Sequence, residues 1–172
     1  MQFNKSHDLS GIIAKKDIST YLNAAHLDVA GSRLVATDGH KLVCIPVTIE
    51  DGDTSGPVTA EAIKAAIKAA GRNGYAAIAC NSSLAVANGP SFPRPDPDDI
   101  GKFPDHEQIM PKAGTAQIGI NAEYLAAIQK AAGAKGIGLQ FALNDDGTID
   151  RNSAVRVHVG ADVIAVVMPM RI

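Results

Sequence analysis

The residue types that most often catalyse reactions or bind metals are scattered through this sequence. The two cysteines are 36 residues apart, and no nucleophile elbow G-x-S-x-G or phosphate loop G-x-x-x-x-G-K-[ST] occurs. Asn144–Gly147 resembles part of a calcium loop, but Ala142 and Ser153 stand where carboxylates would be needed, so we predict a hairpin turn there. The histidines lack the paired spacing of helical metal ligands; they are His7, His26, His40, His106 and His158. We therefore interpret the chain as a protein that is not an enzyme and has no cofactor or metal.

Phosphate binding is a second chemistry to consider, because Lys64, Lys68 and Arg72 recur every four residues. Charges at this spacing usually form the solvated face of a helix. Three of them could also contact a DNA backbone, although weakly and without reading bases. The formal net charge of −2 gives no general attraction to nucleic acid or anionic lipid.

The composition is that of a globular protein, with 46% hydrophobic and 20% charged residues in 172. This length suits one domain, or two small ones that share a core. Cys44 and Cys80 lie in apolar, strand-like runs, which favours reduced thiols over a disulfide. The segment Met1–Asp8 has no apolar core of a secretion signal, and no run is as long as a membrane span. We expect a cytoplasmic protein without membrane contact.

The elements that would position any site begin with a hairpin. Asp38-Gly39 joins two apolar runs, Arg33–Ala36 and Leu42–Val47. Asp-Gly between such runs is a strong hairpin signal, because glycine accepts the positive φ of a tight turn. By itself this turn is a structural feature.

Capping residues predict two helices. Thr59 can cap the first and Gly71 closes it, while Asn121 and Gly133 bound the second. We expect the apolar residues of the second helix to face inward; they are Tyr124, Leu125, Ile128 and Ala132.

Strands alternate with these helices, and the order strand, helix, strands occurs twice after residue 56. We predict strands at 17–27, 32–36, 41–47, 75–80, 83–87, 115–120, 137–143, 154–159 and 163–168. The acidic stretch 49–56 and the proline-rich stretch 90–102 are expected to be loops. The pattern predicts an α+β fold of two β-α-β-β-β halves, with the helices on one face of antiparallel sheets.

Three sequence blocks together carry a specific resemblance. They are Ala36-Thr37-Asp38-Gly39-His40-Lys41-Leu42, the segment from Phe103 to Pro111, and the terminal run from Val166 to Ile172. In this order they resemble the ATDGHR-L turn, the FPDYRR-like segment and the terminal VMPMRL of the bacterial DNA polymerase III β subunit, the sliding clamp. The resemblance implies a clamp-like domain, the fold of DNA clamps and processivity factors.

The resemblance covers selected parts of a clamp subunit, which has three domains of two β-α-β-β-β halves. Residues 17–47 and 57–111 are similar to the middle domain, and residues 115–172 to the second half of the last domain. We therefore divide the chain into 1–56, which completes the first sheet, 57–111 and 115–172, together forming one compact domain. We interpret it as a shortened, phage-type clamp.

In this family, the cleft between the middle and last domains binds short peptide motifs of polymerases and repair factors. Matched motif by motif, the cleft residues here would be Leu22, Thr37, Gly39, His40, Lys41, Leu42, Pro104, Ile109, Asn121, Tyr124, Val166, Met168, Pro169, Met170 and Arg171. Their types suit this role, because Leu, Val, Pro and the adaptable Met can surround a hydrophobic anchor of the peptide.

Some positions depart from the family pattern. Lys41 stands where the family usually has an arginine, Glu107 and Gln108 replace a basic pair, and the proline-rich stretch replaces a sheet strand. The interfaces that close a clamp ring are not all represented.

Three functions follow from the resemblance. The leading one is a replication accessory protein that retains the peptide cleft, acting as a small clamp or as a decoy. The second is an oligomeric ring around duplex DNA, with Lys64, Lys68 and Arg72 contacting the DNA backbone. The third is a structural or regulatory domain with a vestigial cleft.

Overall fold

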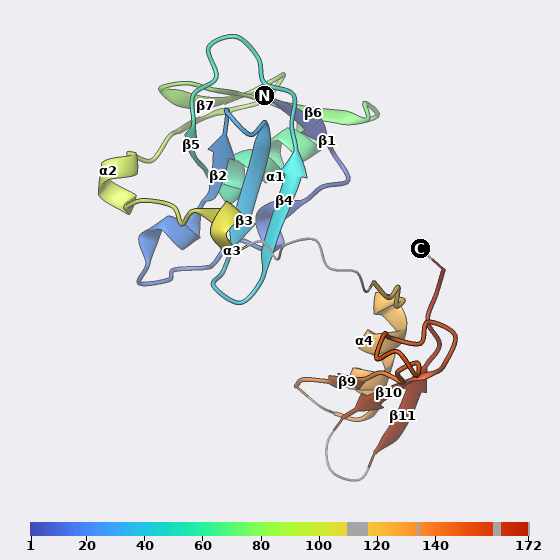
Figure 1. Ribbon diagram of the computed structural model, residues 1–172. Coiled ribbons are helices and arrows are strands. Elements are labelled where there is room, and N and C mark those ends of the chain that lie inside the picture. Colours follow the sequence, from blue (N-terminus) through green and yellow to red (C-terminus); the bar gives the residue numbers. More distant parts are fainter. Residues whose placement is uncertain (110–116, 134, 160–162, 172) are drawn as a thin grey trace. The chain divides into compact units, whose positions relative to one another are not determined.

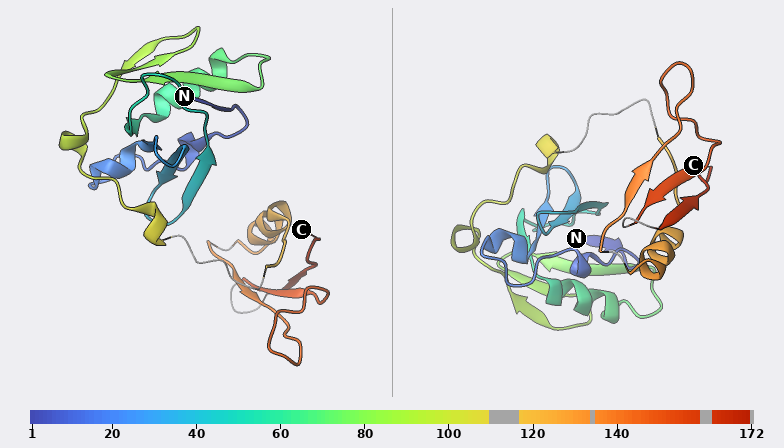
Figure 2. Two further views of the ribbon diagram at one scale, coloured as in Figure 1. Left: turned by 45° about the horizontal axis from the view of Figure 1, so that its top comes forward. Right: turned by 90° about the horizontal axis from the view of Figure 1, so that it is seen from below.

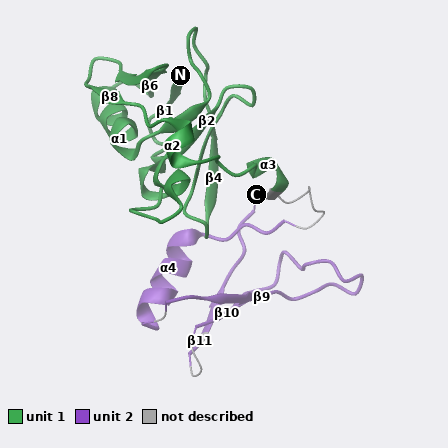
Figure 3. Cartoon of the chain, turned by 90° about the vertical axis from the view of Figure 1, so that its left-hand side faces the viewer, with its two compact units in different colours: residues 1–109 green, residues 110–172 purple. Residues whose placement is uncertain are grey.

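Two compact units, residues 1–109 and 110–172, make up the chain (Figures 1 and 3). The computed structural model describes residues 1–109, 117–133, 135–159 and 163–171. The division of the sequence into 1–56, 57–111 and 115–172 within one compact domain stays a prediction. In the structure, the apolar residues of the C-terminal unit gather in a cluster of their own. We refer to residues 1–109 as unit 1 and to residues 110–172 as unit 2.

Unit 1 contains two antiparallel sheets of four strands each. One has the order β1-β6-β7-β8 and the other the order β4-β3-β2-β5. The strands of the first sheet are Gln2–Asn4 (β1), Tyr75–Cys80 (β6), Ser83–Val86 (β7) and Ser91–Pro93 (β8). Those of the second are Ala25–Asp28 (β2), Arg33–Thr37 (β3), Leu42–Pro46 (β4) and Gly56–Val58 (β5).

Unit 1 itself consists of two halves, one with β1 to β4 and one with β5 to β8. The first strand of each half joins the sheet of the other half. β1 from the N-terminus pairs with β6, and β5, which precedes the helix of the second half, pairs with β2. Phe3 on β1 and Val58 on β5 are buried in one common cluster. The exchange therefore joins both sheets around a single core.

Helix α1 (Ala60–Ala69) packs against β6 and β7 and fills that core (Figure 2). Thr59 caps it by accepting a hydrogen bond from the Ala62 amide at 3.3 Å, and Gly71 follows it with a φ of +54°. Ile63 and Ala66 are buried. The helix predicted from its caps is confirmed.

The segment before the first hairpin differs from the prediction. A strand was predicted at 17–27, but residues Thr20–Asn23 form a 3-10 helix, and β2 begins only at Ala25. Local hydrogen bonds explain this, because the Asp17 carboxylate accepts from the Ser19 amide and the Leu22 amide donates to the Ser19 carbonyl. A second 3-10 helix, Leu9–Gly11, lies upstream and packs against α1.

The proline-rich stretch was predicted to be a loop that replaces a strand, and this prediction is wrong. It contains the strand β8 and the short helix α2 (Pro97–Ile100). β8 is an edge strand that pairs with β7 alone, so Pro93 at its end costs little ladder hydrogen bonding. Asp96 caps α2, and Pro97 occupies a first-turn position where a proline is tolerated.

Unit 2 has a single three-stranded antiparallel sheet, with the helix α4 (Ala122–Ala131) on one side of it (Figure 1). The sheet order is β11-β10-β9. The strands are Gly138–Gln140 (β9), Val155–His158 (β10) and Ile164–Val167 (β11). The Asn121 side chain caps α4 by accepting from the Glu123 amide at 2.8 Å. The predicted turn at Asn144–Gly147 is confirmed by a hydrogen bond from the Gly147 amide to the Asn144 carbonyl.

Two details of unit 2 differ from expectation. Of the predicted strand 115–120, the first two residues lie outside the described residues, and the remainder forms an isolated bridge between Gly119 and Met170. Tyr124 does not face inward, because 58% of it is exposed. The predicted α+β fold with antiparallel sheets is nevertheless confirmed.

Candidate peptide-binding site

The hairpin between β3 and β4 is held by side-chain hydrogen bonds within the turn. The Asp38 carboxylate accepts from the backbone amides of His40 and Lys41, both at 3.0 Å. The Gly39 amide donates to the Thr37 hydroxyl at 3.1 Å, and Gly39 has a φ of +85°. This left-handed conformation favours glycine, so the residue types fix the shape of the turn.

Charge adds to this turn. The Lys41 ammonium forms an ion pair with the Asp38 carboxylate, and it is the main reason why the pKa of Asp38 lies far below its ordinary value. The backbone amides of the turn act in the same direction. The exposed turn therefore presents His40 and Lys41, and the Asp38 carboxylate that holds the turn stays ionised at neutral pH.

Apolar side chains lie behind the turn. Leu22 is 8% exposed, and a Cβ placed on Gly39 would lie 3.9 Å from its Cδ1 atom. Leu42 is half-buried and pairs with Thr37 across the hairpin. Unit 1 thus brings together the predicted residues Leu22, Thr37, Gly39, His40, Lys41 and Leu42. We call these six residues the hairpin wall.

The segment after the proline-rich stretch crosses the sheet face on which Thr37 of the hairpin wall lies. His26, Val35 and Cys44 lie directly opposite one another in the strand register, so they share a face, and Thr37 follows two residues after Val35. The Phe103 ring stacks on His26, with centroids 5.0 Å apart and planes inclined by 13°. The predicted residues Pro104 and Ile109 belong to this segment. Pro104 is exposed, and the side chain of Ile109 lies outside the described part.

The short helix α3 (His106–Ile109) continues this segment. His106 is buried, and its Nε2 atom is 3.7 Å from the Glu107 carboxylate. Burial raises the pKa of the Cys44 thiol, and the nearby Glu107 carboxylate adds to the increase. The influence of Glu107 on Cys44 indicates that α3 lies near the sheet that carries the hairpin wall.

A small pocket beside the stacked pair was missed by the sequence reasoning. It has a volume of about 200 Å³ and is lined mainly by apolar groups, among them Tyr21, Pro57, Ile100 and Phe103. Burial lowers the pKa of His26, which favours the neutral ring. No spacing in the sequence connects residue 26 with residue 103, so only the fold reveals the pair.

The predicted site residues of unit 2 gather at the C-terminal end. Met168 and Met170 are 60% and 51% exposed, and Val166 is also exposed, whereas Val167 is buried. The Met170 amide donates to the Gly119 carbonyl at 2.9 Å. An open pocket of about 470 Å³ is lined by Gln117, Ile118, Gly119, Arg151, Asn152, Met168, Pro169, Met170 and Arg171. We call Met168–Arg171 the C-terminal segment.

The remaining predicted residues of unit 2 lie at the start of α4. The side-chain oxygen of Asn121 already accepts the helix-capping hydrogen bond from the Glu123 amide. Tyr124 presents an exposed ring one turn along. The predicted site residues therefore fall into two sets, one in each unit.

The basic stripe is shorter than predicted. Lys64 and Lys68 are exposed on α1, but Arg72 follows the end of the helix, after Gly71. It does not continue the helical spacing, because the left-handed Gly71 ends the helix. Lys15 and Lys16 line a pocket together with Lys64, so the exposed basic groups around α1 include residues that the sequence pattern did not reveal.

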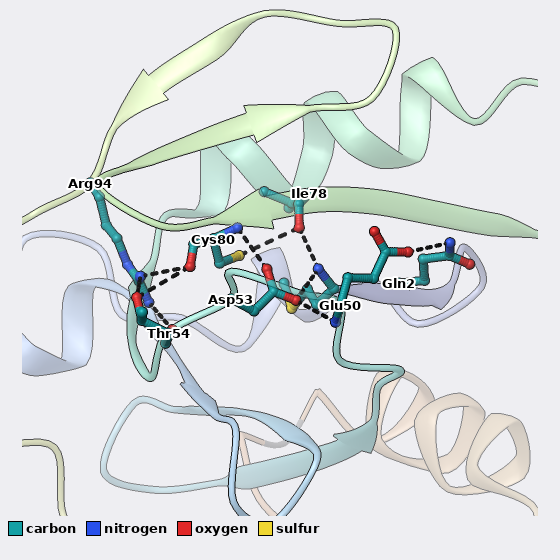
Figure 4. A network of polar contacts seen from close by, with 8 residues as sticks. Gln2, Glu50, Asp53, Thr54, Ile78, Cys80 and Arg94 are labelled. Atoms are coloured by element: carbon teal, nitrogen blue, oxygen red, sulfur yellow. Dashed lines mark hydrogen bonds and ion pairs between the residues drawn. The ribbon is translucent and has the colours of Figure 1, made fainter.

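A buried polar network stabilises unit 1 away from these surfaces (Figure 4). The Asp53 carboxylate accepts from the amides of Glu50 and Cys80 and pairs with the ammonium of Met1 at 2.5 Å. Burial opposes ionisation of Asp53, but these contacts outweigh it and lower its pKa. Nearby, the Arg94 guanidinium donates to the carbonyls of Thr54, Pro57, Cys80 and Asn81.

Other site types find no support in the described part of the chain. Its His, Cys, Asp and Glu side chains form no cluster of three or more that could hold a metal ion. None of the helices there is long and apolar enough to cross a membrane.

Solved structures of similar fold include bacterial sliding clamps. A DNA polymerase sliding clamp from Pseudomonas aeruginosa matches with a TM-score of 0.62 and 20% identity, over 100% of this chain and 66% of the clamp. A sliding clamp from the same organism bound to griselimycin matches with a TM-score of 0.60 and 21% identity, over 100% of this chain and 65% of the clamp.

This chain has a sliding-clamp fold. It spans slightly less than two thirds of the length of these clamps. No protein-family model matches the chain, and no curated protein matches it either. At this level of identity the similarity concerns the fold, so function rests on the two sets of site residues.

Proposed function

We propose that this protein is a shortened relative of the bacterial DNA polymerase III β subunit and binds the clamp-binding peptides of replication and repair proteins. The observation that carries the proposal is the hairpin wall. Its glycine turn is fixed by Asp38, its floor is the buried Leu22, and it lies on the sheet face that the segment from Phe103 to Glu107 crosses.

The chemistry of the two sets suits a short peptide with hydrophobic anchors. Leu22 and Leu42 supply an apolar surface in unit 1, and Met168 and Met170 supply exposed, adaptable side chains in unit 2. The polar edge at His40 and Lys41 can hydrogen-bond to a polar residue of the peptide. We propose that one peptide contacts both sets, with its apolar residues providing most of the binding free energy.

The fold comparison supports the same reading, since one of the similar clamps was solved with griselimycin bound. Griselimycin is therefore a useful second probe, which should compete with the peptide if both occupy these residues.

The test is a titration of the full chain with a fluorescent Gln-Leu-x-Leu-Phe peptide, followed by anisotropy. The variant Leu42→Ala with Met168→Ala should weaken binding at least about tenfold, because each change removes an apolar contact worth about 1 kcal/mol or more. The control is Tyr75→Ala with Leu143→Ala, which removes two exposed apolar side chains outside both sets and should leave affinity unchanged.

Two outcomes would contradict the proposal. The first is no saturable binding by the native chain, which would favour a structural or regulatory domain whose cleft is vestigial. The second is binding that survives the double change at Leu42 and Met168, which would place the peptide elsewhere.

Contact with duplex DNA is a second candidate, favoured by the exposed Lys64 and Lys68 on α1 and by Lys15 and Lys16 beside them. An oligomer that encircles DNA would let these groups contact phosphates. Retention on duplex DNA should fall with rising salt and be lost in a Lys64→Ala, Lys68→Ala variant, while Lys130→Ala in unit 2 serves as the control. Retention that is insensitive to salt or to both lysines would exclude this function.

A further inference from the structure

The helices α1 and α4 occupy matching positions in two similar segments, the half of unit 1 that begins at β5 and unit 2. Each has ten residues, and in each a glycine with positive φ follows twelve residues after the cap, Gly71 after Thr59 and Gly133 after Asn121. Adding 62 to the number of a residue in or near α1 therefore gives its counterpart in or near α4. This internal match allows unit 2 to be compared with unit 1 position by position.

Burial differs at the matched positions. Ile63 and Ala66 of α1 are 0% and 1% exposed, but their counterparts Leu125 and Ile128 are only half-buried. Ala62 is fully buried, whereas its counterpart Tyr124 is 58% exposed. The described part of unit 2 buries four residues in its core, and unit 1 buries twenty. A layer that covers the helix in unit 1 therefore has no counterpart among the described residues of unit 2.

The strand pairing shows which layer this is. In unit 1, β5 lies just before the Thr59 cap and pairs with β2 of the other half, while β6, the strand after the helix, pairs with β1 of the other half. The counterparts in unit 2 are residues 118–120 and the strand β9. Within the described residues, β9 pairs with β10 alone, and residues 118–120 belong to no sheet.

In β5 and in residues 118–120, the middle carbonyl accepts a hydrogen bond from a residue that follows the last strand. In unit 1 the carbonyl of Pro57 accepts from the guanidinium Nε of Arg94, which follows the last strand of that half, at 3.0 Å. Its counterpart Gly119 accepts from the amide of Met170, which follows the last strand of unit 2, at 2.9 Å. The edge that β5 uses to pair with β2 corresponds to an edge of 118–120 that forms no strand pair within the described residues.

We propose that unit 2 of a second copy of this chain supplies the absent half. In the dimer, residues 118–120 of each copy would pair with β9 of the other, giving two four-stranded sheets around one shared core. The arrangement is self-complementary under a twofold axis, because one copy offers both the strand and the edge that the other needs. It reproduces the exchange of first strands that joins the two halves of unit 1.

A second copy fits better than an unrelated partner, because the two halves of unit 1 show that such halves are built to cover each other. The pairing would cover the open edge of β9 and the half-buried Leu125 and Ile128 at the same time.

The test combines light scattering with hydrogen exchange on the full chain over a range of protein concentrations. The expected mass at high concentration is twice the 17.8 kDa of one chain. As the dimer forms, the amides of 118–120 and 138–140 should exchange more slowly, while those of β6 and β7 stay unchanged.

A pair of variants makes the test specific to the edge of β9. Leu139→Lys places a charge on that strand and should shift the equilibrium to the monomer. Leu143→Lys, outside β9 and more exposed, should leave the dimer intact. Protection of the β10 and β11 amides in both variants verifies that unit 2 remains folded.

Each alternative result overturns the proposal. A monomer at all concentrations does so, and a monomer with protected 138–140 amides would mean that this chain covers its own edge. A dimer whose β9 amides exchange as in the monomer, or one that survives Leu139→Lys, would place the interface elsewhere.

Discussion

Helices α1 and α4 have the same length and equivalent caps, but they differ in what covers them. α1 lies in a core to which both halves of unit 1 contribute, and Ile63 is fully buried there. α4 lies on a three-stranded sheet, and its counterpart Leu125 is half-buried. The comparison teaches that local residues set where a helix begins and ends, whereas its burial depends on a second half elsewhere in the fold.

The largest difference is expected from matched truncations in the two helices. Ile63→Ala should lower the free energy of unfolding by about 2–5 kcal/mol, because it leaves a cavity in a closed core. Leu125→Ala should cost less than half as much in the monomer, because solvent already reaches that site. Denaturant unfolding, followed by a probe in each unit, measures both. Equal losses would contradict the comparison.

The Asp53 network should stabilise unit 1 without affecting unit 2. Asp53→Asn removes the ion pair with Met1 and should cost about 1–3 kcal/mol. The pKa of Asp53 is lowered on folding, so its ionised form stabilises the protein above about pH 4, and this contribution is lost as the pH falls through the folded pKa. The variant should therefore lose less stability on acidification than the native chain.

The control for that experiment is Asp146→Asn in unit 2, an exposed carboxylate whose pKa is also lowered, by Thr148. It should leave the acid unfolding of unit 1 unchanged. If Asp53→Asn unfolds with the same pH dependence as the native chain, the buried ion pair does not contribute to acid stability.

Alanine substitutions at two glycines of unit 1 separate the effect of backbone strain on stability from an effect on peptide binding. Gly39 and Gly52 have φ values of +85° and +87°, so an alanine at either position should cost about 1–2 kcal/mol. Only Gly39→Ala should also weaken peptide binding, because it alters the hairpin wall. Anisotropy titration of both variants measures this. Equal effects on affinity would mean that the hairpin wall has no special role.

The smallest effects are expected at the helix caps, and here the two units should agree. Thr59→Ala and Asn121→Ala each remove a side-chain acceptor and should each cost about 1 kcal/mol. Thermal unfolding of each variant checks this. A much larger loss for one of them would show that its cap also holds tertiary structure.

The sequence predicted those parts of the fold that depend on neighbouring residues. Thr59 and Gly71 bound α1 as expected, and Asp38-Gly39 forms the expected hairpin, because caps and tight turns are set within a few residues. The prediction failed where distant strands decide the outcome. β8 forms despite Pro93 because β7 offers an edge, and Tyr124 is exposed because its neighbours leave it uncovered.

The site was predictable to a similar degree. The residues of the hairpin wall are close in sequence, apart from Leu22, and the resemblance to the sliding-clamp turn motif points to them. The stack of Phe103 on His26 could not be predicted, because 77 residues separate them and neither belongs to a periodic pattern. Lys15 and Lys16 were missed because only the fold brings them beside Lys64.

The most direct test of the central claim is to follow backbone amide signals by nuclear magnetic resonance while the Gln-Leu-x-Leu-Phe peptide is added to the full chain. If one peptide contacts both sets of residues, the signals of Gly39 and Leu42 in unit 1 and of Met168 and Met170 in unit 2 should shift together, with a single dissociation constant. Shifts confined to one unit, or centred on the pocket beside His26, would contradict the account.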